Sequence, residues 1–93
     1  LGTEYAGAQC KVVPINSDTY EIVGIDEQPT YHTAALKQLI KNLKEKASEP
    51  RIQLYCIIES WRETDWKDSV RSALSGNGFQ LKKITDGDEE YYT

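Results

Sequence analysis

The chain has 93 residues, of which 39% are apolar, 28% charged and 10% aromatic. That length suits one domain with a modest core, and that composition excludes disordered and collagen-like proteins. The longest apolar run, residues 54–58, is far shorter than the roughly 20 residues that span a bilayer, so we expect no membrane partner.

The formal net charge of −4 comes from one short segment near the end of the chain. Asp86, Asp88, Glu89 and Glu90 have no base among them, and the remaining 11 acids balance the 11 bases. A body without net positive charge lacks the feature that drives non-specific binding to phosphates. The sequence therefore argues against nucleic acid as the main partner.

The sequence begins with Leu1 and contains no methionine, so we interpret it as a domain excised from a larger protein or a processed product. Residues 1–9 have neither the charged start nor the apolar run of a signal peptide. We expect residues 1–93 to form a single domain, with residues 1–8 as a flexible lead-in and residues 86–93 as a marginal acidic hairpin.

The two cysteines, Cys10 and Cys56, have no C-x-x-C spacing and no histidine at metal-ligand spacing. Cys56 lies inside the apolar run, where a thiol usually behaves as a small buried hydrophobe. We expect two unpaired core thiols, which favours a reducing, intracellular setting such as the cytoplasm. We expect no cofactor.

The first half of the chain predicts a hairpin followed by a helix. Residues 9–15 and 20–25 have strand-like composition and are separated by the turn residues 16–18. Pro14 has no N–H for a ladder and makes the first strand a candidate edge strand. The helix has an apolar stripe at helical spacing, formed by Leu36, Leu39, Ile40, Leu43 and Ala47.

The second half predicts a central strand, a helix and two further strands. Residues 51–58 are a near-continuous β-rich run, so we expect Ile57 and Ile58 both to be buried. Ser60 and Glu63 have the spacing of a capping box, with Thr64 as the alternative cap. The core stripe of the second helix is Trp66, Val70, Ala73 and Leu74.

Residues 79–84 form the next strand and residues 89–92 a marginal last one. We expect Tyr91 or Tyr92 to pack on residues 79–84, and Lys82 and Lys83 to face Glu89 or Glu90. The order β-β-α-β-α-β-(β) predicts an α/β (α+β) two-layer sandwich with a mixed sheet and two helices. The sequence does not show whether both helices lie on one face of the sheet, because neither face of the central strand has a polar pattern.

Acidic and aromatic residues follow the two strands expected to be parallel, and the ends of such strands are where ligands usually bind. If these strands are adjacent, the residues converge on one rim. The metal ligands would then be Asp26, Glu59 and Glu63, and the catalytic groups His32 and Glu59. The reading we favour is that these acids stabilise helix starts and that His32 is exposed without a role.

The candidate binding residues are of two kinds. Trp61 lies outside the core stripe beside Arg62, a composition typical of binding hot spots; alternatively it covers the sheet edge. The first helix carries Tyr31 at its start, and Lys37, Lys41 and Lys44 on its outer face. These lysines form a solvated face or, in the alternative, a docking stripe for an acidic partner.

Standard catalytic signatures, such as G-x-S-x-G and the P-loop, are missing from the sequence. We therefore expect a non-enzymatic protein-interaction or regulatory module that binds a protein partner or the rest of its parent chain. One alternative is a small Mg²⁺- or Mn²⁺-dependent enzyme domain that uses the acidic rim. The other is a nucleic-acid-binding domain that uses the lysine stripe and the tyrosines.

Overall fold

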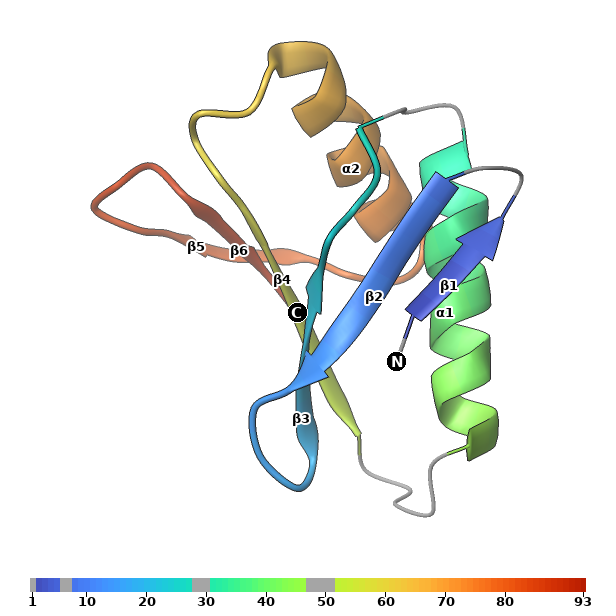
Figure 1. Ribbon diagram of the computed structural model, residues 1–93. Coiled ribbons are helices and arrows are strands. Elements are labelled where there is room, and N and C mark those ends of the chain that lie inside the picture. The colour runs from blue at the N-terminus through green and yellow to red at the C-terminus, as the bar shows by residue number, and fades with distance from the viewer. Residues whose placement is uncertain (1, 6–7, 28–30, 47–51) are drawn as a thin grey trace.

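The computed structural model describes residues 2–5, 8–27, 31–46 and 52–93. The elements are β1 (Gly2–Tyr5), β2 (Ala8–Pro14), β3 (Thr19–Val23), α1 (His32–Lys46), β4 (Gln53–Ile58), α2 (Thr64–Gly76), β5 (Leu81–Ile84) and β6 (Glu90–Tyr92). The strands form one sheet in the order β1-β2-β3-β4-β6-β5 (Figure 1). Only β3 and β4 are parallel among the described strands. The predicted α+β class, mixed sheet and element order are confirmed.

The segment predicted as a flexible lead-in contains the strand β1. It pairs antiparallel with β2, with Thr3 opposite Cys10. The prediction that β2 is an edge strand is therefore wrong over this stretch. Pro14 lies beyond the part of β2 that pairs with β1, so the ladder between β1 and β2 does not need the N–H that proline lacks.

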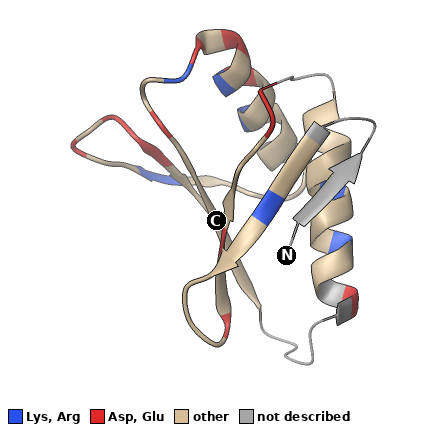
Figure 2. Ribbon diagram, in the orientation of Figure 1, with Lys and Arg blue, Asp and Glu red and all other residues tan. Residues whose placement is uncertain are grey.

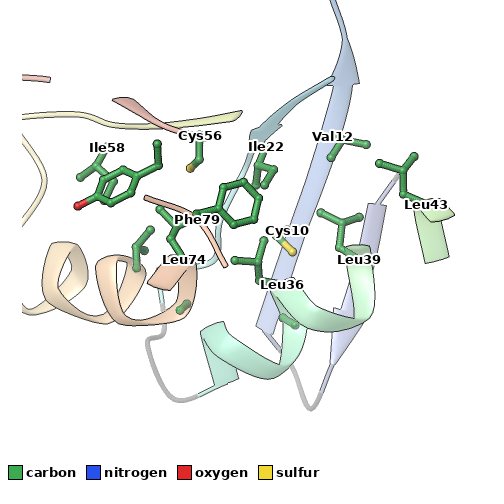
Figure 3. Close-up of a cluster of buried hydrophobic side chains, with 14 of the residues drawn as sticks. Cys10, Val12, Ile22, Leu36, Leu39, Leu43, Cys56, Ile58, Leu74 and Phe79 are labelled. Atoms are coloured by element: carbon green, nitrogen blue, oxygen red, sulfur yellow. The ribbon is translucent and has the colours of Figure 1, made fainter. Parts of the chain in front are cut away.

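Both helices pack on the same face of the sheet. Strand alternation turns every second side chain toward the helices, and the helical stripes complete the core (Figure 3). Its members include Cys10, Val12, Ile22, Leu36, Leu39, Leu43, Cys56, Ile58, Trp66, Val70, Ala73, Leu74, Phe79 and Tyr92. The predicted stripes are confirmed, except that Ile40 is only half-buried and Ala47 lies outside the described residues.

The other face, called here the open sheet face, is covered by no helix of the described chain. Tyr55 and Tyr91 stack there with ring centroids 5.2 Å apart. Ile57 also points to this face and is half-buried, so the prediction that it is buried is wrong. Its neighbour Ile58 points toward the helices and is 1% exposed, as predicted.

The last strand, β6, lies inside the sheet between β4 and β5. Tyr92 is buried and pairs with Cys56 of β4 on one side and Leu81 of β5 on the other. The structure confirms that β5 and β6 form a hairpin and places β6 between two strands. Two flanking strands and a buried tyrosine make the end of the chain part of the core sheet.

The cross-strand pairs within this hairpin differ from the predicted ones. Lys83 lies opposite Tyr91, with its ammonium 5.2 Å from the ring centroid, and Ile84 lies opposite Glu90. Glu90 points toward α2, where Arg71 donates two hydrogen bonds to its carboxylate. The expected pairing of Glu90 with Lys82 or Lys83 is therefore wrong, because a helix supplies the counter-charge.

Cys10 and Cys56 are unpaired and buried, as predicted. Burial raises the pKa of Cys10 to about 11 and that of Cys56 to about 12, so both thiols are uncharged near neutral pH. Neither described helix has the length and apolar composition needed to cross a membrane.

Candidate interaction surface at the ends of the parallel strands

The strands β3 and β4 are adjacent and parallel, which is the condition under which the sequence predicts that the residues after them share one end of the sheet. Asp26 and Glu27 follow β3, and the segment from Glu59 to Glu63 connects β4 to α2. These residues share one end of the sheet, and we call this end the rim.

The most exposed aromatic side chain of the rim is Trp61, which is 69% exposed. Its indole Nε1 donates a hydrogen bond of 2.8 Å to Glu59 Oε2. The guanidinium of Arg62 lies 4.2 Å from the ring centroid of Trp61 and 4.4 Å from that of Trp66. Of the two alternatives that the sequence left open, the structure therefore shows the exposed one, and the orientation of Trp61 is set by two neighbours.

Arg62 is a support for Trp61 more than an exposed anchor, since its side chain is only 16% exposed. Its Nη1 donates to Glu27 Oε1 at 2.6 Å, and its Nη2 lies 3.6 Å from Glu59 Oε1. Its Nε is buried and has no hydrogen-bond partner among the described residues. A guanidinium held by two carboxylates and two rings fixes the loop between β4 and α2.

His32 is 4% exposed, so the expectation of an exposed, idle histidine is wrong. Its Nε2 donates to the backbone oxygen of Asp26 at 2.7 Å, and Ser69 Oγ lies 3.0 Å from its Nδ1. Trp66 Nε1 donates to the same oxygen at 2.9 Å. Both ring nitrogens of His32 therefore tie the segment after β3 to the two helices.

The three carboxylates considered as metal ligands do not form a cluster. The carboxylate of Glu59 accepts a hydrogen bond from Trp61 and forms an ion pair with Arg62. Glu63 is exposed and occupies the N-cap position of α2 without a side-chain capping bond, so the predicted capping box with Ser60 is wrong. Within the described ranges, no group of three or more His, Cys, Asp or Glu side chains could hold a metal ion.

A groove of about 330 Å³ begins beside the rim and runs onto the open sheet face. Its charged wall residues are Glu21, Glu59, Glu89 and Arg62. Its apolar walls include Val23, Ile25, Ile57 and Trp66. Sequence reasoning missed this groove, because Glu21 and Glu89 are joined only by the non-local pairing of β4 with β3 and β6.

The remaining candidate binding residues lie on α1 or directly before it. Tyr31 precedes the helix and is exposed, and Lys37 and Lys41 are exposed along it. The side chain of Lys44 lies outside the described residues. Figure 2 shows the basic positions of α1 apart from the acidic residues at the end of β3, the start of α2 and the turn between β5 and β6. The docking role of this stripe stays a prediction.

Comparisons with known proteins give no assignment for this site. No family model, no curated protein and no solved structure matches the chain. The geometry of the rim and the groove is therefore the basis for a functional proposal.

Proposed function

We propose that this chain is a protein-interaction module whose binding surface is centred on Trp61. The observation that carries the proposal is an indole that is 69% exposed and yet held by Glu59 and Arg62. Tryptophan is enriched among the residues that dominate binding energy. An aromatic side chain that is already oriented loses little conformational entropy when a partner covers it.

The neighbouring groups support a non-enzymatic role. His32 uses both ring nitrogens in hydrogen bonds, and Glu59 positions Trp61 and Arg62. A surface whose polar groups support one exposed aromatic side chain suits recognition better than proton transfer. The partner is another protein or another part of the parent chain, and the unpaired buried thiols favour a reducing, intracellular setting.

The experiment is selection of random peptides displayed on phage against the whole chain, followed by affinity measurement of the selected peptides. Trp61→Ala should weaken their binding about 30-fold, the effect of losing a hot-spot residue. Ile15→Ala is the matched control, since Ile15 is an exposed apolar residue in the turn between β2 and β3, away from the rim. Its binding should equal that of the wild type.

The Trp61→Phe variant separates contact from orientation. Phenylalanine keeps a ring over Arg62 but cannot donate to Glu59, so its affinity should lie between those of the wild type and Trp61→Ala. Selected peptides that bind Trp61→Ala as tightly as the wild type would contradict the proposal, provided that the amide spectrum of the variant shows the native fold.

A further inference from the structure

We propose that the groove beside Trp61 binds a basic side chain, lysine or arginine, of the partner segment that Trp61 anchors. This inference rests on the proposed interaction function and names the chemistry of its partner. The groove and Trp61 belong to one surface, because Glu59 and Arg62 line the groove and also contact the indole.

The charges around the groove favour a cation. Arg62 is already neutralised by Glu27 and Glu59. That leaves Glu21 and Glu89, which form no ion pair with any described residue. Glu21 accepts only a long hydrogen bond of 3.4 Å from Tyr55 among the described side chains.

Basic residues near the groove weaken this field and do not reverse it. Lys67 Nζ donates to the backbone oxygen of Ser60 in the rim, and the ammonium of Lys83 lies 5.2 Å from the ring centroid of Tyr91. The aliphatic stem of Lys11 lies along Gly24, with its Cε 3.0 Å from where a Cβ of Gly24 would stand. Among the residues that line the groove, the three carboxylates of Glu21, Glu59 and Glu89 exceed the one cation, Arg62, by two charges. A ligand cation therefore gains more attraction than repulsion.

The walls of the groove suit the stem of such a side chain. Val23, Ile25 and Ile57 supply apolar surface between the carboxylates. Lysine and arginine bury their methylene groups on apolar surface and keep the charged end near polar groups. A volume of about 330 Å³ accommodates one long side chain and part of its backbone.

Four further exposed acids lie on the elements that border the groove, against the three bases Lys67, Lys82 and Lys83. The acids are Glu63 and Asp65 at the start of α2, and Asp86 and Asp88 in the turn between β5 and β6 (Figure 2). A field of one sign speeds the approach of an oppositely charged segment and disfavours one of like charge. A basic segment of a protein partner is thus preferred over an acidic one.

The test uses a phage library in which basic and acidic residues occur equally often. Peptides that need Trp61 should be enriched in lysine or arginine, and rising salt should weaken their binding. Glu89→Gln and Glu21→Gln should each weaken these peptides roughly two- to fivefold, the effect of one partly exposed charge pair. Lys11→Gln should tighten them. Glu45→Gln, an equal charge change at an exposed position of α1, is the control and should have no effect.

The outcomes separate the two proposals. Peptides that lose binding to Trp61→Ala but tolerate Glu89→Gln and Glu21→Gln would overturn the basic-side-chain inference and leave the interaction function standing. Peptides that are insensitive to Trp61→Ala as well would overturn both. Self-association of the wild type that Glu89→Gln abolishes, measured by sedimentation, would place a second copy in the groove and also overturn the inference.

Discussion

Trp61 and Trp66 contact the same guanidinium, that of Arg62, although one indole is 69% exposed and the other 7%. The arrangement joins an exposed aromatic ring to the core through a single cation. It also gives the protein two tryptophans with opposite access to solvent, which makes their roles separable by experiment.

Acrylamide quenching should therefore reach one tryptophan and spare the other. In Trp66→Phe, where only Trp61 fluoresces, quenching should be strong; in Trp61→Phe, where only Trp66 fluoresces, it should be weak. Acrylamide is neutral, so the acidic rim does not repel it. Equal shielding of both tryptophans would show that Trp61 is covered within the domain.

Trp61→Ala should change the free energy of unfolding by no more than about 0.5–1 kcal/mol, because it removes one exposed hydrogen bond and one exposed cation–π contact. Urea unfolding monitored by circular dichroism measures this. A loss as large as that of a core truncation would mean that Trp61 serves stability and not binding.

Ile58→Ala should destabilise the protein by about 2–5 kcal/mol, because Ile58 is fully enclosed between the sheet and the helices. Ile57→Ala should cost about 1 kcal/mol, since half-burial on the open sheet face leaves less apolar area to lose. Urea unfolding measures both losses, and each variant serves as the control for the other. Equal losses at both positions would mean that the open sheet face is covered.

The sequence was sufficient for the elements with long, regular patterns. The stripe from Leu36 to Leu43 and the run before Ile58 predicted α1 and β4, and the second stripe placed Trp66 in the core and Trp61 outside it. These are local signals, each carried by apolar spacing within one element. The sequence left open whether β3 and β4 are adjacent, because apolar spacing does not show which strands pair.

Non-local contacts account for what the sequence did not predict. Three residues, Glu90 to Tyr92, are too short to show alternation, so nothing indicated that β6 lies between β4 and β5. The burial of His32 depends in part on Ser69, which is distant in sequence and meets the imidazole only because α2 packs beside α1. The groove likewise needs Glu21 and Glu89 to meet across three strands.

Amide exchange at Tyr91 and Tyr92 should be as slow as in β4, because β6 has a strand on each side. Deleting residues 88–93 should unfold the domain, since it removes a strand between two others and the buried Tyr92. Fast exchange at both tyrosines, or a deletion variant that keeps a cooperative transition, would contradict this placement.

The ion pair between Arg71 and Glu90 should make the free energy of unfolding depend on pH in the acid range. Hydrogen bonds from Arg71 hold the pKa of Glu90 below its ordinary value of 4.5, so the folded state binds its proton less readily than the unfolded state. The resulting stabilisation is present above that value and is lost as the pH falls through the lower folded pKa. Glu90→Gln should reduce the dependence of the free energy of unfolding on pH in the acid range. It should also lower that free energy by about 1–2 kcal/mol at neutral pH. If the pH dependence of stability in the acid range were the same in Glu90→Gln as in the wild type, the ion pair would not be its cause.

Alkaline conditions should also destabilise the protein. Burial raises the pKa of Tyr92 from 10.0 to about 12 and that of Cys56 from 9.0 to about 12. The unfolded state loses these protons first, so stability is full below pH 9 and falls as the pH rises toward 12. Urea unfolding at a series of pH values measures this, and the free energy of unfolding of Cys56→Ala should fall less steeply with pH. If it fell as steeply as that of the wild type, the Cys56 thiol would not contribute to the loss.

The most direct test of the interaction surface is to follow the two indole N–H resonances while a selected peptide is added to ¹⁵N-labelled protein. Trp61 Nε1–H lies at the exposed rim, whereas Trp66 Nε1–H is bonded to the backbone of Asp26 in the interior. We predict that the Trp61 resonance shifts and saturates with the peptide while that of Trp66 moves little. A Trp61 resonance that stays in place while the amides of Lys37 and Lys41 shift would contradict the account and place the binding surface on α1.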